Sequence, residues 1–89
     1  MSRWLVRVWW LEHADARAEA AANRSERLGE FSAEPLEPVR VTVDGADAWK
    51  VGVSMVVDGR TAKVAVITAL AALEGVDGVH PVALRADAV

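Results

Sequence analysis

The residues best suited to chemistry are two histidines, His13 and His80, with Glu12 beside the first of them. Imidazole and carboxylate groups bind divalent transition metals and exchange protons near neutral pH. The three side chains would meet if a strand ending at His13 ran antiparallel to a strand beginning at His80. They lack a compact ligand spacing such as His-x-x-x-His. We therefore treat them as weak metal candidates and expect no bound metal, no other cofactor and no catalytic residue.

The composition excludes several other kinds of site. The chain of 89 residues has no cysteine, so it forms no disulfide, thiolate zinc site or cysteine nucleophile. Its net charge of -3 argues against a generally polybasic binder of nucleic acid or membrane, although a local basic face remains compatible with it. Its Asp-Gly pairs are isolated turn signals rather than parts of a phosphate-binding loop. A chain of this length has room for one domain and one core.

The amino-terminal third of the chain predicts a strand, a helix and a loop. From Trp4 to Leu11, side chains alternate with a period of two and include aromatic and β-branched residues, which is typical of a strand. Residues 14–28 carry an alanine-lined stripe at helical spacing and end before Gly29. Residues 29–37 contain glycine, serine and proline without periodicity, which predicts a loop.

The middle of the chain predicts two strands, over residues 39–43 and 49–57, because valines alternate with polar residues in both. The Asp44-Gly45 pair between them is typical of a tight hairpin. A two-residue loop would place Val43 opposite Ala46 and turn the two apolar series to opposite faces. We therefore expect a loop of three or five residues.

The carboxyl-terminal third predicts a second helix and a last strand. Thr61 can cap a helix whose apolar residues follow helical spacing up to Gly75. The alternative is a hairpin at Asp58-Gly59, which would make residues 60–67 a strand. A last strand is expected over residues 79–85, followed by a frayed tail at residues 86–89.

This order of elements is typical of one α+β fold, the ferredoxin-like βαββαβ arrangement. It has a four-stranded antiparallel sheet in the order 4-1-3-2, with two helices on one face. We expect one domain over residues 1–89, with an ordered core at about 3–85. The longest apolar run, residues 64–73, is about half the roughly 20 residues that cross a bilayer. The expected location is therefore the cytoplasm, with no membrane contact.

Three groups of proteins with this topology resemble the chain in part. Residues 73–79, Leu-Glu-Gly-Val-Asp-Gly-Val, resemble the junction before the last strand of heavy-metal-associated domains, although the metal-binding cysteine pair of that family is absent. Residues 50–57 stand where RNA recognition motifs have their third strand and begin with a basic residue as it does, but the aromatic residues of that strand are absent, so Trp9 alone would occupy a base-stacking position. Small cofactor-independent monooxygenases resemble the fold and pair through their sheets. Their pocket would here be faced by Trp4, Trp10, Trp49 and His80.

The sheet face away from the helices is the strongest functional candidate. If the apolar alternates point toward the helices, this face mixes bulky apolar groups with cations, and its members are Leu5, Arg7, Trp9, Leu11, Arg40, Lys50, Ser54 and Arg85. The second helix adds the outward apolar residues Val64 and Ile67. Exposed apolar clusters usually mark interfaces. We therefore predict a small non-enzymatic module that forms a homodimer or binds another protein. The alternatives are single-stranded nucleic-acid binding on the same face, and a monooxygenase-like enzyme.

Overall fold

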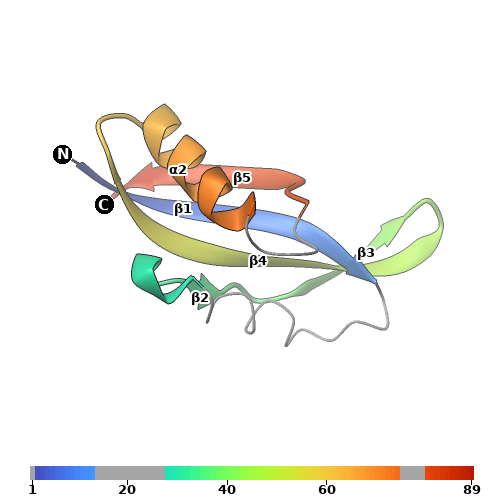
Figure 1. Cartoon of the computed structure of the whole chain (residues 1–89). Coiled ribbons are helices and arrows are strands. Elements are labelled where there is room, and N and C mark those ends of the chain that lie inside the picture. Colours follow the sequence, from blue (N-terminus) through green and yellow to red (C-terminus); the bar gives the residue numbers. More distant parts are fainter. Residues whose placement is uncertain (1, 14–27, 75–79) are drawn as a thin grey trace.

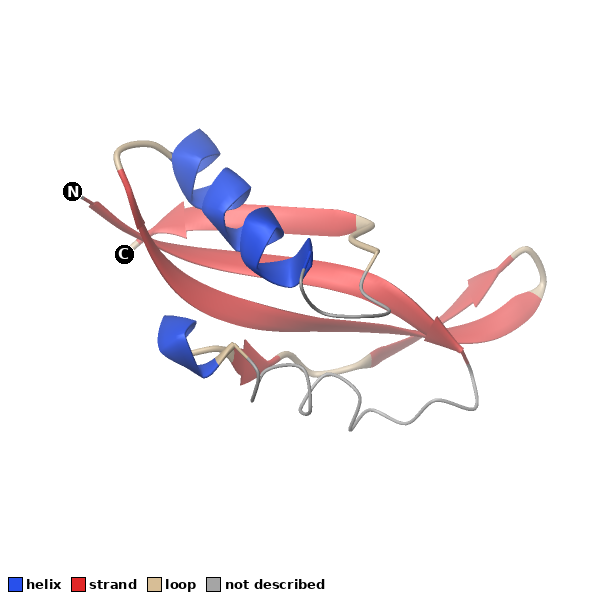
Figure 2. Cartoon of the chain, in the orientation of Figure 1, coloured by secondary structure: helices blue, strands red, loops and turns tan. Residues whose placement is uncertain are grey.

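The computed structural model describes residues 2–13, 28–74 and 80–89 (Figure 1). In these ranges, strands make up most of the structure and one α-helix lies on them (Figure 2). The elements in chain order are β1 (Ser2–His13), the 3-10 helix η1 (Gly29–Phe31), β2 (Glu34–Pro35), β3 (Val39–Val43), β4 (Ala46–Gly59), α2 (Ala62–Glu74) and β5 (Ala83–Ala88).

All five strands form one open antiparallel sheet built on two long central strands. β1 and β4 pair without interruption from Ser2 opposite Gly59 to His13 opposite Ala48. β5 pairs with the other edge of β1, from Trp4 opposite Ala88 onward. β3 and β2 share the remaining edge of β4, one after the other along its length. The sheet is therefore longest at its centre and interrupted along one side.

The expected ferredoxin-like α+β fold is wrong. The described residues contain one α-helix, and their five strands form a mostly β structure rather than four strands under two helices. The fifth strand arises because the chain before β3 pairs briefly with β4 through Glu34 and Pro35. The first of the two expected helices, at residues 14–28, falls almost entirely outside the described residues.

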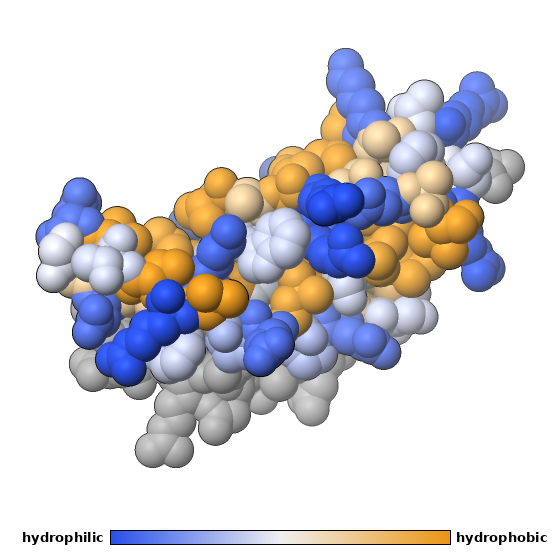
Figure 3. Space-filling model, turned by 180° about the vertical axis from the view of Figure 1, so that it is seen from behind, coloured by the Kyte–Doolittle hydropathy of each residue, from blue (hydrophilic) through white to orange (hydrophobic). Residues whose placement is uncertain are grey.

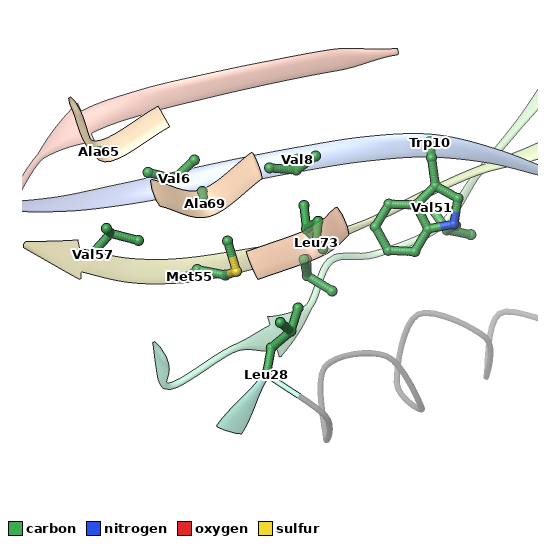
Figure 4. Packing of buried hydrophobic residues seen from close by; sticks show 11 residues of the cluster. Val6, Val8, Trp10, Leu28, Val51, Met55, Val57, Ala65, Ala69 and Leu73 are labelled. Carbon is green, nitrogen blue, oxygen red and sulfur yellow. The ribbon is translucent and has the colours of Figure 1, made fainter. Parts of the chain in front are cut away.

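The core lies between α2 and one face of the sheet (Figure 4). Alternate residues of the two central strands are fully or almost fully buried there, namely Val6, Val8, Trp10, Val51, Val53, Met55 and Val57. The helix contributes Ala65, Ala69 and Leu73, and the two small residues let its backbone lie close to the strands. Each fully buried aliphatic side chain of this kind stabilises the fold by roughly 1.5–3 kcal/mol.

Helix α2 begins as its capping residue predicts. The backbone N–H of Val64 donates to Thr61 Oγ1 at 3.3 Å, which satisfies one of the amide groups left unpaired at a helix start. The alternative hairpin at Asp58-Gly59 is therefore wrong, since the helix runs from Ala62 onward. On its outward side, Val64 and Ile67 are 44% and 57% exposed.

The hairpin between β3 and β4 has a two-residue loop, so the expected loop of three or five residues is wrong. Asp44 and Gly45 both have positive φ, 51° and 80°, which is the signature of a type I′ turn. Val43 therefore pairs with Ala46. As a result, the valines of β3 lie on the side of the sheet opposite to the buried valines of β4.

The carboxyl-terminal strand also differs from the expectation. β5 begins at Ala83 rather than at residue 79, which lies outside the described residues, and it includes residues 86–88, which were expected to fray. Backbone bonds hold both of its ends, from the N–H of Val82 to the Trp9 carbonyl at 2.9 Å and from the N–H of Val89 to the Arg3 carbonyl at 3.0 Å. Among the described helices, none is long and apolar enough to cross a membrane.

Candidate interaction surface on the open sheet face

The open face is the side of the sheet opposite α2, seen in Figure 3, where apolar and charged groups are interspersed. Its central row is formed by the β1 residues whose neighbours point into the core, Leu5, Arg7, Trp9 and Leu11. Directly paired residues share a face, so the adjoining β4 row contains Val56, Ser54, Gly52 and Lys50. On the other side, β5 adds Asp87, Arg85 and Ala83. The alternation in β1 therefore places its four predicted site residues together.

Trp9 is held at the centre of the open face by a glycine. Gly52 lies opposite Trp9, and it is buried although it belongs to the open face. A Cβ on Gly52 would lie 2.8 Å from Trp9 Cδ1 and 3.1 Å from Leu36 Cδ1, and closer still to the Val8 carbonyl oxygen. The absence of a side chain therefore creates the space in which the indole and Leu36 cover the sheet. The N–H of Leu36 also donates to the Gly52 carbonyl at 2.8 Å, and this bond holds Leu36 beside Gly52.

The apolar part of the open face extends from Trp9 toward the β3–β4 hairpin. Leu11 is 39% exposed, and the β3 residues Val39 and Val43 are 54% and 38% exposed. Pairing places these two valines on the face of Lys50 and Ala46. A hollow of about 250 Å³ lies at this end, lined by Leu11, Glu12, Val43, Ala46, Asp47 and Ala48.

Cations on the open face are mostly paired. Asp87 accepts from Arg7 at 3.0 Å and forms an ion pair with Arg85 at 2.9 Å. The Lys50 ammonium lies over the Trp9 ring, 5.4 Å from its centroid, which is a cation–π geometry. At the far end, Arg3 and Asp58 form a looser exposed pair at 3.7 Å. The face therefore presents both signs of charge around its apolar centre.

Arg40 does not belong to the open face, which corrects the prediction. The two-residue turn pairs it with Trp49, on the face that carries the core. Its guanidinium lies 5.6 Å from the Trp49 ring centroid and 3.5 Å from an Asp47 carboxylate oxygen. The side chain therefore covers the exposed end of an indole rather than contributing to the candidate surface.

Of the three polar candidates for a metal site, the structure describes the side chains of Glu12 and His80. Glu12 Oε1 accepts a hydrogen bond from the Trp10 indole N–H at 2.8 Å, so its carboxylate is used in holding a core side chain. His80 is exposed, and the side chain of His13 lies outside the description. Among the described side chains, which do not include that of His13, no group of three histidine, cysteine, aspartate or glutamate residues could hold a metal ion.

The predicted set of open-face residues lacked Leu36, Val39, Val43, Val56 and Asp87, among others. The signal for the two β3 residues was present in the Asp44-Gly45 pair, whose type I′ preference places Val43 across from Ala46. Leu36 had no such signal, because its position depends on a short pairing of β2 with β4.

Comparisons of this chain with protein-family models, with curated proteins and with solved structures find no match. The surfaces described above are therefore the basis for proposing a function.

Proposed function

We propose that this chain is a non-enzymatic, self-associating module whose open face packs on the open face of a second copy. The observation that carries the proposal is the apolar row from Leu5 through Trp9 and Leu11 to Val39 and Val43. Burial of such a row against a partner removes apolar surface from water, which is the main favourable term in association. Interfaces also favour aromatic residues at their centre, where Trp9 lies.

A second copy suits this face because its charges complement themselves. A two-fold interface brings the same patch of both subunits together, so each patch needs both signs of charge. Asp87 lies beside two arginines, and Asp58 beside Arg3, around the apolar row. Charged groups at the edge of an apolar centre match the usual anatomy of an interface, with its polar rim.

The same charges make the face less suited to single-stranded nucleic acid. Base stacking would need the Trp9 ring, but Lys50 lies over it. Two of the arginines that could contact phosphates, Arg7 and Arg85, share the Asp87 carboxylate. The monooxygenase alternative is weakened in turn by Trp10, which is fully buried with its N–H bonded to Glu12 and so serves the core.

The test is the molecular mass in solution by analytical ultracentrifugation. We expect more than one chain per particle for the natural sequence and a loss of mass for Trp9→Arg, with the circular dichroism unchanged. Ile67→Arg is the matched control, because it adds the same charge on the exposed side of α2. A natural chain that is monomeric at every concentration examined would rule out the proposal, and dissociation by Ile67→Arg alone would move the interface to α2.

A titration with a labelled single-stranded oligonucleotide separates the nucleic-acid alternative. Binding driven by phosphate contacts falls steeply as salt rises from low to physiological concentration, whereas an apolar interface changes little. Salt-sensitive oligonucleotide binding that is lost with Trp9→Arg would overturn our proposal in favour of nucleic-acid binding.

The cytoplasmic location expected from the sequence also stays a prediction.

A further inference from the structure

The outer edge of β5 is a second surface, distinct from the open face. β5 pairs with β1 along one side, and no described residue pairs with its other side. The six residues of β5 are Ala83, Leu84, Arg85, Ala86, Asp87 and Ala88. An unpaired edge presents backbone N–H and C=O groups that can pair with another strand. Its side chains decide which strand fits.

The backbone bonds show which residues of β5 face outward. In an antiparallel ladder, the N–H and C=O groups of successive residues point alternately to the two sides of the strand. The N–H of Val89 donates to the Arg3 carbonyl, so Val89 points toward β1. By alternation within β5, Asp87 and Arg85 also point their backbone groups toward β1. The bond from Val82 to Trp9 lies before the strand and is one residue out of its register, because Trp9 pairs with Ala83. The outward N–H and C=O groups are therefore those of Leu84, Ala86 and Ala88.

The register that pairs all three outward residues of one β5 with those of a second β5 also avoids like charges across the ladder. An antiparallel pair centred on Ala86 sets Leu84 opposite the partner's Ala88 and Arg85 opposite the partner's Asp87. Shifting the centre toward Leu84, so that Leu84 meets the partner's Ala86, would place Arg85 opposite the partner's Arg85. Shifting it the other way would place Asp87 opposite the partner's Asp87. Opposite charges directly across a ladder stabilise it and like charges destabilise it.

We propose that two copies of this chain join their sheets by antiparallel pairing of β5 with β5 about a two-fold axis at Ala86. The two Ala86 residues exchange backbone hydrogen bonds at the axis, and Leu84 exchanges them with the partner's Ala88. The two pairs of Arg85 with the partner's Asp87 lie on either side of the axis. The side chains of Arg85 and Asp87 pair with each other within the chain at 2.9 Å but are 68% and 39% exposed, so both can also reach a neighbour. Leu84, which is 41% exposed on the helix-bearing face, gains an apolar neighbour.

This edge contact uses the outer backbone groups of β5 rather than the apolar row of the proposed face-to-face contact, although Arg85 and Asp87 border both surfaces. The two contacts are compatible. A two-fold axis at Ala86 stands perpendicular to the sheet, so the open faces of both copies stay on the same side. The joined sheet can then still stack on another through its open face. Edge contact and face contact together would give a particle of four chains, whereas either one alone would give a dimer.

The test compares variants that act on the edge by two different means. Arg85→Asp places like charges opposite each other at both flanking pairs, and we expect it to weaken edge association about tenfold. The double variant Arg85→Asp/Asp87→Arg restores opposite charges across the edge and should recover the natural mass. Arg60→Asp is the control, since it makes the same charge change at an exposed residue between β4 and α2.

Ala86→Pro is the second means, because it removes the outward N–H at the axis and leaves the bonds of β5 to β1 in place. We expect it to abolish edge association with the β-sheet circular dichroism retained. Should it unfold the chain, the charge variants still decide the matter. Unchanged sedimentation for Arg85→Asp overturns the edge proposal.

Trp9→Arg separates this proposal from the proposed function. If both contacts exist, Trp9→Arg leaves an edge-joined dimer and Trp9→Arg combined with the edge variant leaves a monomer. If Trp9→Arg alone gives a monomer, the proposal of a face contact stands and the proposal of an edge contact is overturned. A dimer that ignores Trp9→Arg but responds to Arg85→Asp would overturn the face contact and support the edge contact.

Discussion

Trp9 and Gly52 face each other across the two central strands, and the indole occupies the volume that any side chain at position 52 would need. The glycine is thus a packing requirement of the open face rather than a weak point of β4. Its φ angle is not in the positive range, so ordinary residues could adopt its backbone conformation. Only the space above it excludes them.

Gly52→Ala is expected to destabilise the protein by about 1–3 kcal/mol, since the new methyl group meets a backbone oxygen of Val8 that cannot move away easily. Trp9 would also be displaced, which should shift the tryptophan emission. Urea denaturation followed by fluorescence measures both effects. Gly29→Ala is the control, because nothing lies within 4 Å of a Cβ there. Equal stability of the two variants would show that Gly52 is not tightly packed.

The type I′ turn gives a second prediction. Gly45→Ala forces a β-carbon onto a residue with φ of 80° and should cost about 1 kcal/mol of unfolding free energy. Asp44→Asn should be close to neutral, because asparagine also tolerates positive φ. Thermal denaturation by circular dichroism compares the two. A harmless Gly45→Ala would mean that the loop has another conformation in solution.

Glu12 is expected to act as a structural acceptor rather than as a metal ligand or a catalytic base. Glu12→Ala removes the hydrogen bond that Glu12 accepts from the buried Trp10 N–H and should lower the free energy of unfolding by about 1–3 kcal/mol. Glu12→Gln keeps an acceptor oxygen and should lose less. Chemical denaturation ranks the three chains. Zinc or nickel that stabilises the natural chain but not Glu12→Gln would contradict this role.

The two sides of α2 should respond very differently to truncation. Leu73→Ala leaves a cavity against the sheet and should cost about 2–5 kcal/mol, because the side chain is only 2% exposed. Ile67→Ala removes an exposed side chain and should change stability by less than about 0.5 kcal/mol. Calorimetry of both variants checks the difference. A large loss for Ile67→Ala would show that a partner covers this side of the helix in solution.

The sequence predicts the parts of the fold that bury one face. In β1, alternation separates Val8 and Trp10 from Trp9, and the structure confirms that division. In α2, helical spacing and Thr61 predict the start of the helix, because a buried stripe leaves a periodic trace. In these elements, burial against the core determines which side chains point inward.

At the edges of the sheet, that selection is weak, and the predictions fail there. The valines of β3 lie beyond the buried core, so the geometry of the Asp44-Gly45 turn decides their face instead. Half of the residues of β5 are alanines, whose pattern carries little information, and its bounds follow from pairing with β1. The β1 residues of the open face were therefore predictable, whereas Arg40 was assigned to the wrong face because the face of all of β3 was predicted wrongly.

The uninterrupted ladder between β1 and β4 also bears on how fast the protein folds. Its pairs join residues far apart in sequence, such as Ser2 with Gly59, whereas the β3–β4 hairpin joins close neighbours. A hairpin of that kind forms in roughly 1–10 μs, but distant pairings must first overcome the entropy of closing a long loop. We expect the hairpin to form early and β1 to dock in the rate-limiting step. Substitutions along β1 would then slow refolding, whereas changes in α2 would mainly speed unfolding.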